Sequence, residues 1–133
     1  MQVKDLMQTE VVTLHVADTL DLAEDIMRLG RIRHLPVIDE SNHLVGVVTQ
    51  HDLLKASVSS VLGFDRTKEK EWLGTVRVQD VMTIEVTTIE AGAGIVEAVD
   101  KLILGKFGCL PVVENNQLVG LMTETDCLPA LSG

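Results

Sequence analysis

An internal duplication limits what this chain can fold into more than any other feature does. Residues 3–56 align with residues 78–130 once a single residue near "ESNH" is removed, and about 20 of the 53 aligned positions are identical. "VKDLM" matches "VQDVM", "LPVID" matches "LPVVE", and "LVGVVTQHD" matches "LVGLMTETD". A solenoid usually needs three or more repeats, so two copies favour a pseudo-dimer that completes one core. We divide the chain into repeat 1 (residues 1–62), an inter-repeat segment (63–75) and repeat 2 (76–133).

Each copy has the pattern of strand, helix, strand, strand and helix. In repeat 1, "EVVTL" is rich in β-formers, and Asp18 and Thr19 are suitable N-cap residues for the helix that follows. The apolar face of that helix carries Leu20, Ala23 and Met27, and Gly30 is expected to end it. In repeat 2, Gly94 replaces Thr19, so we expect a less well capped helix there.

A hairpin is expected to follow the first helix of each copy. "HLPVID" and "LVGVV" form its strands in repeat 1, and Pro36 favours an edge or strand-start position. The turn is "ESNH" in repeat 1 and the tighter "ENN" in repeat 2, where Asn tolerates a positive φ.

A Thr and an Asp three residues apart follow the last strand of both copies: Thr49 and Asp52, then Thr123 and Asp126. A Thr at the N-cap with an acidic residue at N3 forms a capping box. The same helix start suits a nucleotide, because its free N–H groups and positive dipole end attract phosphate. A Thr hydroxyl adds a donor, and an Asp carboxylate accepts the hydroxyls of a ribose. The motif alone leaves both interpretations open.

Composition excludes several classes of function. The net charge of −9 argues against a broad nucleic-acid surface and against docking to anionic membranes. No apolar run is long enough to span a membrane, and "MQVKDLMQTE" lacks the apolar segment of a signal peptide, so we expect a soluble, cytoplasmic protein. Cys109 and Cys127 match no metal or redox spacing and are expected to be buried, reduced thiols. His15, His43 and His51 lie on different elements, so no metal site is expected.

The segment between the copies is expected to extend the last helix of repeat 1 and then to form a loop. Leu54, Val58 and Leu62 are spaced by four and form an apolar stripe, which is either core or a face for a second protomer. "DRTKEKE" is a solvated run of mixed charge, and Trp72 and Leu73 are expected to pack back on the body.

The ordered set of segments, present twice, resembles the CBS domain, and the chain resembles a stand-alone CBS pair (a Bateman module). The resemblance implies an α+β fold of two β-α-β-β-α repeats packed as a pseudo-twofold pair, with helices outside two small three-stranded sheets. It implies regulatory adenosine ligands (AMP, ADP, ATP or S-adenosylmethionine) in two clefts, with no required cofactor. In each cleft, the segment before the Pro of one copy would face the Thr and Asp of the other. The Asp would bind ribose and the Thr phosphate.

Transferred to this sequence, the resemblance gives two unequal clefts. The first predicted cleft would combine Val12, Ile32, Arg33, His34 and Pro36 with Thr123, Thr125 and Asp126. The second predicted cleft would combine Thr87, Phe107, Gly108, Cys109 and Pro111 with Thr49, His51 and Asp52. "GRIRHLP" places Arg31, Arg33 and His34 beside the first cleft, whereas "GKFGCLP" offers only Lys106 beside the second.

The first cleft is therefore expected to be the better nucleotide site. Arg33 can bind a phosphate through two parallel hydrogen bonds, although Arg31 and Arg33 can also belong to a solvated loop. With an ordinary pKa of about 6.5, His34 would either add charge near a phosphate below neutral pH or stay neutral in its strand.

The preferred function is sensing of an adenosine nucleotide, which would favour one orientation of the two halves and be passed to an effector protein in trans. A homodimer through the helices is expected. The alternative is a dimerisation or interaction module with empty clefts. Catalysis is not expected: Gly92 and Gly94 lack the third Gly of a dinucleotide fingerprint, and Asp52 and Asp126 already have other roles.

Overall fold

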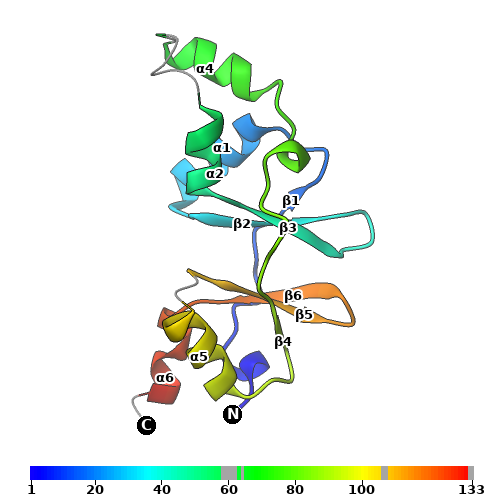
Figure 1. Ribbon diagram of the computed structural model, residues 1–133, viewed down its shortest axis with the longest axis vertical. Helices are drawn as coiled ribbons and strands as arrows, with labels where there is room; N and C mark the ends of the chain where they lie inside the picture. The colour runs from blue at the N-terminus through cyan, green and yellow to red at the C-terminus, as the bar shows by residue number, and fades with distance from the viewer. Residues whose placement is uncertain (58–62, 64, 106–107, 132–133) are drawn as a thin grey trace. The chain divides into compact units, whose positions relative to one another are not determined.

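The structure is a computed structural model that describes residues 1–57, 63, 65–105 and 108–131. Its residues form two compact units. Unit 1 comprises residues 1–12, 41–44 and 87–133, and unit 2 comprises residues 13–40 and 45–86. Each unit contains a three-stranded sheet with helices on one face (Figure 1). The α+β fold class expected from the sequence is confirmed.

Unit 2 is built mainly from repeat 1. Its sheet has the order β1 (Leu14–His15), β2 (His34–Ile38), β3 (Leu44–Thr49), and β1 runs parallel to β2. Its helices are α1 (Leu20–Gly30), α2 (Gln50–Ala56) and α4 (Arg66–Leu73), with the 3-10 turn η2 (Val78–Asp80). Within the described residues of this unit, nine buried side chains form one core cluster. They are Leu14, Leu20, Ala23, Met27, Leu35, Val37, Val48, Leu73 and Val78.

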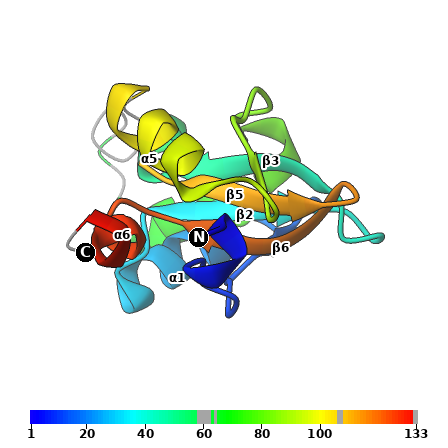
Figure 2. The ribbon, with the colours of Figure 1, turned by 90° about the horizontal axis from the view of Figure 1, so that it is seen from below.

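Unit 1 is built mainly from repeat 2. Its sheet has the order β4 (Ile89–Glu90), β5 (Leu110–Glu114), β6 (Gln117–Met122). Its helices are α5 (Ile95–Leu104) and the short α6 (Leu128–Leu131), with the 3-10 turns η1 (Val3–Asp5) and η3 (Thr125–Cys127). Figure 2 shows η1, close to the N-terminus, on the same side of this sheet as α5 and α6.

The first segment of each repeat packs in the unit that is built from the other repeat. Val3, fully buried, lies in the core of unit 1, and its N–H donates to the Ala93 carbonyl at 2.9 Å. Val78, also fully buried, lies in the core of unit 2, and its N–H donates to the Asp18 carbonyl at 2.8 Å. We call residues 1–12 and 76–86 the exchanged segments. They contain "VKDLM" and "VQDVM", the matching starts of the two repeats.

The predicted strands and turns are confirmed with two adjustments. "EVVTL" pairs only at Leu14, so the expected first strand is much shorter than predicted. β2 is the central strand of its sheet rather than an edge, but β1 pairs only with Val37 and Ile38, so Pro36 lies beyond the end of its neighbour. A Pro has no N–H to donate, so a position without a partner in β1 suits it. In the tight turn of repeat 2, Asn115 and Asn116 have φ values of 53° and 65°.

The helix ends differ from the prediction in detail. Thr19 is the N-cap of α1, but its side chain makes no capping bond, and Gly94 makes none at α5. The expected difference in side-chain capping is therefore wrong. Gly30 is the last residue of α1, but Arg31 is the residue that adopts the left-handed conformation, at φ 54°.

Helix α4 is a feature that the sequence analysis missed, because "DRTKEKE" was interpreted as a solvated loop. Asp65 caps α4 by accepting from the Lys68 N–H at 2.9 Å. Leu73 is buried in the core as predicted, whereas Trp72 stays 40% exposed and donates its indole N–H to the Ala56 carbonyl at 3.0 Å. Leu54, in the stripe expected at Leu54, Val58 and Leu62, is 70% exposed and is therefore not core, while its role as a face for a second protomer stays a prediction. Val58 and Leu62 lie outside the described residues.

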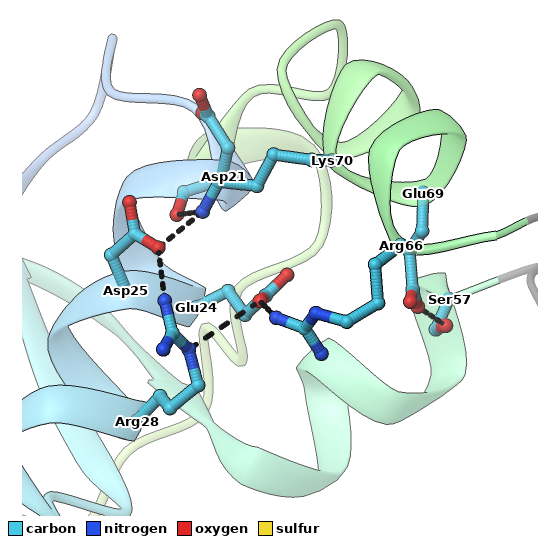
Figure 3. A network of polar contacts seen from close by, with 8 residues as sticks. All are labelled: Asp21, Glu24, Asp25, Arg28, Ser57, Arg66, Glu69 and Lys70. Carbon is cyan, nitrogen blue, oxygen red and sulfur yellow. Dashed lines mark hydrogen bonds and ion pairs between the residues drawn. The ribbon is translucent and has the colours of Figure 1, made fainter.

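Charged and polar contacts hold α4 against α1 and α2 (Figure 3). Lys70 pairs with Asp25 and donates to the Asp21 carbonyl at 2.9 Å, and Arg66 pairs with Glu24 at 3.1 Å. Ser57, just after α2, donates to Glu69. The bond from Lys70 lowers the pKa of the Asp25 carboxyl. Among the described residues of the inter-repeat segment, α4 thus contacts the rest of unit 2 through the buried Leu73 and through the ion pairs of Arg66 and Lys70.

Candidate functional site

The Thr-x-x-Asp element of repeat 1 forms the predicted capping box. The Thr49 hydroxyl accepts from the Asp52 N–H at 3.1 Å, and Asp52 Oδ2 accepts from the Thr49 N–H at 2.9 Å. Asp52 is only 8% exposed. The hydrogen bonds make this burial possible, because a buried carboxylate is tolerated only where donors surround it.

The Thr-x-x-Asp element of repeat 2 differs from the first. Asp126 Oδ2 accepts from the Thr123 N–H at 2.8 Å and from the Thr123 hydroxyl at 3.0 Å. The Thr123 hydroxyl is here a donor rather than the acceptor of a cap. The chain continues through η3 into α6, which has four residues where α2 has seven. Asp126 is half-buried.

Both Asp carboxylates also accept a hydrogen bond from an exchanged segment. Thr83 Oγ1 lies 3.1 and 3.2 Å from the two oxygens of Asp52. Gln8 Nε2 lies 3.0 and 3.3 Å from the two oxygens of Asp126. Gln8 and Thr83 are equivalent positions of the two repeats, directly after the Met of "DLM" and "DVM". Each carboxylate therefore links a helix start to the exchanged segment beside it.

The Gly of each "VG" pair gives the exchanged segment room to approach. A Cβ added at Gly46 would lie 2.7 Å from Met82 Sδ and 2.9 Å from the Thr83 carbonyl oxygen. A Cβ at Gly120 would lie 2.6 Å from Met7 Sδ and 2.8 Å from the Gln8 carbonyl oxygen. The exchanged backbone also pairs at these strands, through Val47 with Thr83 and through Leu121 with Gln8. The same arrangement is thus present in both copies and contains a Gly, a Met, a Thr and an Asp.

The segment before Pro36 lies next to the start of α2. The Arg33 carbonyl accepts from the Gln50 N–H at 3.0 Å. The Arg31 and Arg33 side chains are exposed, and within the part of the chain that the structure describes neither makes an ion pair. Burial lowers the pKa of His34, and the neighbouring Arg33 charge lowers it further. The lowered pKa favours the neutral form of His34, and whether it adds charge near a phosphate below neutral pH stays open.

The equivalent segment of repeat 2 is less polar. Gly108 is exposed, Pro111 is buried, and Phe107 and Lys106 lie outside the described residues. Burial raises the pKa of the Cys109 thiol to about 11, so this group is a neutral thiol at physiological pH. Cys109 and Cys127 are both free; Cys127 is buried as predicted, and Cys109 is only partly buried.

The structure brings some predicted site residues together within a unit. Ile32, Arg33, His34 and Pro36 share unit 2 with Thr49, His51 and Asp52. Val12 and Thr87 share unit 1 with Gly108, Cys109, Pro111, Thr123, Thr125 and Asp126. Each predicted cleft takes residues from both units, so the clefts themselves stay a prediction. Gln8 and Thr83 were not predicted as site residues; the one signal that they share is their equivalent position in the two repeats, directly after the Met.

Beside Asp52 there is a cavity of about 240 Å³, lined by Asp52, Lys55, Ala56 and Val81.

Within the described ranges, no three His, Cys, Asp or Glu side chains gather in a way that would hold a metal ion. In the same part of the chain, no helix combines the length and apolar character needed to cross a bilayer.

The chain is similar to known proteins in both its sequence and its structure. The family model described as CBS domain matches residues 3–59 and 78–133. A CBS domain-containing protein of Dictyostelium discoideum is 32% identical over 130 residues, covering 97% of this chain and 90% of the relative. A homoserine O-acetyltransferase of Methanococcoides burtonii is 30% identical over 125 residues, but the chain spans only 23% of that enzyme.

Three solved structures are similar over nearly the whole chain. The Vibrio cholerae protein described as an acetoin utilization protein (AcuB) is 31% identical with a TM-score of 0.81, covering 99% of this chain and 90% of that one. CBSX2 in complex with AMP is 28% identical with a TM-score of 0.79, covering 98% and 96%. The CBS domain pair of protein MJ0100, in complex with 5-methylthioadenosine and S-adenosyl-L-methionine, is 26% identical with a TM-score of 0.75, covering 100% and 97%.

Proposed function

The chain belongs to the CBS domain family as a pair of CBS domains, and on this premise we propose that it is a regulatory module that binds an adenosine-containing ligand. The observation that supports the proposal is that two similar CBS pairs, matched over nearly their full length, hold AMP in one case and 5-methylthioadenosine with S-adenosyl-L-methionine in the other. AMP, ADP, ATP and S-adenosylmethionine are the ligands that we expect to bind.

The two predicted clefts are proposed as the binding sites, with the first as the stronger. Its exposed Arg31 and Arg33 supply positive charge in a chain whose net charge is −9. Its Asp126 is half-buried, whereas Asp52 of the second cleft is 8% exposed. A guanidinium is charged and can donate two parallel hydrogen bonds, so it binds a phosphate more strongly than a neutral donor does. We therefore expect Arg33 to contribute most to the affinity for the phosphate group.

The chain acts, in this proposal, without catalysis of its own. Ligand binding favours one arrangement of the two repeats, and a partner protein in trans recognises that arrangement. We further propose that the protein is cytoplasmic and forms a homodimer through its helices. In the longer relatives a similar pair occupies a small share of an enzyme, 23% in the case of the homoserine O-acetyltransferase.

Isothermal titration of the full chain with AMP, ADP, ATP, S-adenosylmethionine and NAD tests the proposal. We expect at least one adenosine compound to bind with a micromolar Kd, and Arg33→Ala to weaken a phosphate-bearing ligand about tenfold or more. Arg77→Ala removes the same charge from an exposed position outside the predicted clefts and is the matched control.

Two outcomes would contradict the proposal. If no compound binds below millimolar concentration, the chain is an interaction module with empty clefts. If binding occurs and Arg33→Ala matches the parent and the control, adenosine binding stands, but the first predicted cleft is not the main phosphate site.

A further inference from the structure

Among the described residues, three donors of unit 1 occupy the Asp126 carboxylate and leave about one acceptor position. A carboxylate offers about four lone-pair positions. Asp126 Oδ2 accepts from the Thr123 N–H at 2.8 Å, from the Thr123 hydroxyl at 3.0 Å and from Gln8 Nε2 at 3.0 Å. Asp126 Oδ1 accepts from Gln8 Nε2 at 3.3 Å. The two N–H bonds of an amide nitrogen diverge too widely to point at both oxygens of one carboxylate, so the two Gln8 contacts describe one hydrogen bond shared between the oxygens.

The equivalent Asp52 carboxylate is less fully used. It accepts the Thr49 N–H at 2.9 Å and one donor from the exchanged segment, the Thr83 hydroxyl. A hydroxyl has a single proton, so the contacts at 3.1 and 3.2 Å describe one bond shared between two oxygens. About two acceptor positions of Asp52 therefore remain for another donor. The two repeats differ here because the Thr123 hydroxyl donates to Asp126, whereas the Thr49 hydroxyl accepts from the Asp52 N–H.

A ribose that donates two hydroxyls to Asp126 must displace at least one of the three existing donors. The Thr123 N–H is fixed by the start of η3, and the Thr123 hydroxyl is attached to the same residue. The Gln8 side chain is exposed and reaches Asp126 from the other end of the chain, 118 residues away. The Gln8 amide is therefore the donor that can leave with the least disturbance.

We propose that a ribose-bearing ligand displaces Gln8 from Asp126, so that occupancy of the first predicted cleft is coupled to the N-terminal exchanged segment. This inference rests on the proposed function and adds Gln8 as a residue that sets affinity without being needed for binding. Gln8 also pairs with Leu121 through its backbone, and Met7 covers Gly120. Loss of the side-chain contact is thus transmitted to a segment that fills the core of unit 1 through Val3.

The test compares binding of AMP to the full chain and to Gln8→Met, which keeps the length of the side chain and removes its amide. We expect Gln8→Met to bind AMP about fivefold more tightly, because the ligand no longer breaks this hydrogen bond. Gln117→Met is the matched control, since Gln117 is an exposed glutamine of unit 1 that donates to the Ser41 carbonyl at 3.2 Å. Thr83→Val should change affinity less than twofold, because Asp52 has free acceptor positions. A Kd of Gln8→Met equal to or weaker than that of the parent overturns the proposal.

Backbone hydrogen exchange gives a second measurement. The N–H groups of Val3, Lys4 and Gln8 donate to Ala93, Ala91 and Leu121 and report directly on the exchanged segment. Without ligand, they should exchange about fivefold faster in Gln8→Met than in the parent or in Gln117→Met. Addition of AMP should accelerate them in the parent and leave Gln8→Met unchanged.

The two measurements separate this inference from the proposed function. If the parent binds AMP but neither affinity nor exchange responds to Gln8→Met, the coupling is wrong and the proposed function stands. If no adenosine compound binds the parent, the proposed function fails. The Gln8–Asp126 contact is then tested by backbone hydrogen exchange without ligand. Equal hydrogen-exchange rates in Gln8→Met and in the parent would show that this contact does not stabilise the exchanged segment.

Discussion

Gly46 and Gly120 determine, as single residues, how closely the exchanged segments can approach the strands. An added methyl group at either position would meet a backbone carbonyl oxygen closer than 3.0 Å, in addition to a Met sulfur. The Met side chain can move aside, but the carbonyl belongs to a backbone that pairs with the same strand. We therefore expect Gly46→Ala and Gly120→Ala each to lower the free energy of unfolding by about 1–3 kcal/mol, as overpacking does. Urea denaturation measures the loss.

Gly92→Ala is the control for this prediction. Gly92 is exposed, and a Cβ added there would have no atom within 4 Å. Its substitution should change stability by less than about 0.5 kcal/mol. Equal stability of all three variants would show that the exchanged segments do not pack on these glycines.

His34 gives the molecule a pH dependence whose sign follows from its lowered pKa. Burial is the main cause, with the Arg33 charge adding to it. The unfolded chain, with a His pKa of about 6.5, then binds more protons than the folded chain does. Stability from this group is complete above pH 6.5 and is lost as the pH falls through 6.5 toward the lower folded pKa. Urea denaturation between pH 8 and pH 5 should show a smaller fall for His34→Gln than for the parent. An equal fall in both would contradict the assignment to His34.

The candidate site was predictable from the sequence only where its contacts are local. Thr49 and Asp52 lie three residues apart, so their spacing predicted the capping box that the structure contains. Gln8 donates to Asp126 across 118 residues, and Thr83 to Asp52 across 31. No local pattern marks such partners, because a Gln or Thr after a Met is equally suited to a solvated turn.

Among the elements, those with a buried periodic face were predicted well. α1 and the β2–β3 strands follow their apolar patterns. The strand at "EVVTL" is shorter than its β-propensity suggests, because the chain passes from unit 1 to unit 2 between Val12 and Thr13 and only its end pairs with β2. α4 was missed because its sequence is almost entirely polar, and its stability depends on a buried Leu73 and on partners in α1.

The docking of α4 should depend on Leu73 much more than on its ion pairs. Leu73 is 1% exposed, so Leu73→Ala leaves a cavity and should cost about 2–5 kcal/mol. Lys70→Met removes the ammonium group that bonds Asp25 and the Asp21 carbonyl and keeps most of the apolar stem. Exposed ion pairs are screened by water and salt, so its effect should be far smaller and should shrink further in 1 M NaCl. Urea denaturation at low and high salt measures both. A larger loss for Lys70→Met than for Leu73→Ala would show that the ion pairs, and not the core contact, hold α4.

For the whole molecule, the exchange of segments between repeats was beyond the reach of sequence patterns. "VKDLM" and "VQDVM" present apolar residues at the same three positions and differ there only in Leu6 and Val81, so sequence patterns assign neither to one core. The duplication therefore predicts the fold, but it does not indicate which of the two segments packs in which core. The path of the chain decides it, with residues 76–86 packed in unit 2 and residues 87–133 in unit 1.

This exchange predicts how an isolated repeat behaves. A fragment of residues 76–133 lacks Val3 and Met7 but carries Val78 and Met82, which have the equivalent spacing. We expect two copies of the fragment to exchange residues 76–86, so that each fills the core of the other, as in a domain-swapped dimer. Sedimentation equilibrium should give twice the mass of the fragment, with a folded circular-dichroism spectrum.

Val78→Asp in the fragment should abolish both the dimer and the folded spectrum, because it places a charge where Val3 is fully buried in the complete chain. Val96→Asp is the matched control, since Val96 is 70% exposed on α5. A fragment that is folded and monomeric would show that residues 76–86 can close on their own repeat. The exchange in the complete chain would then follow from competition between two similar segments rather than from the path of the chain.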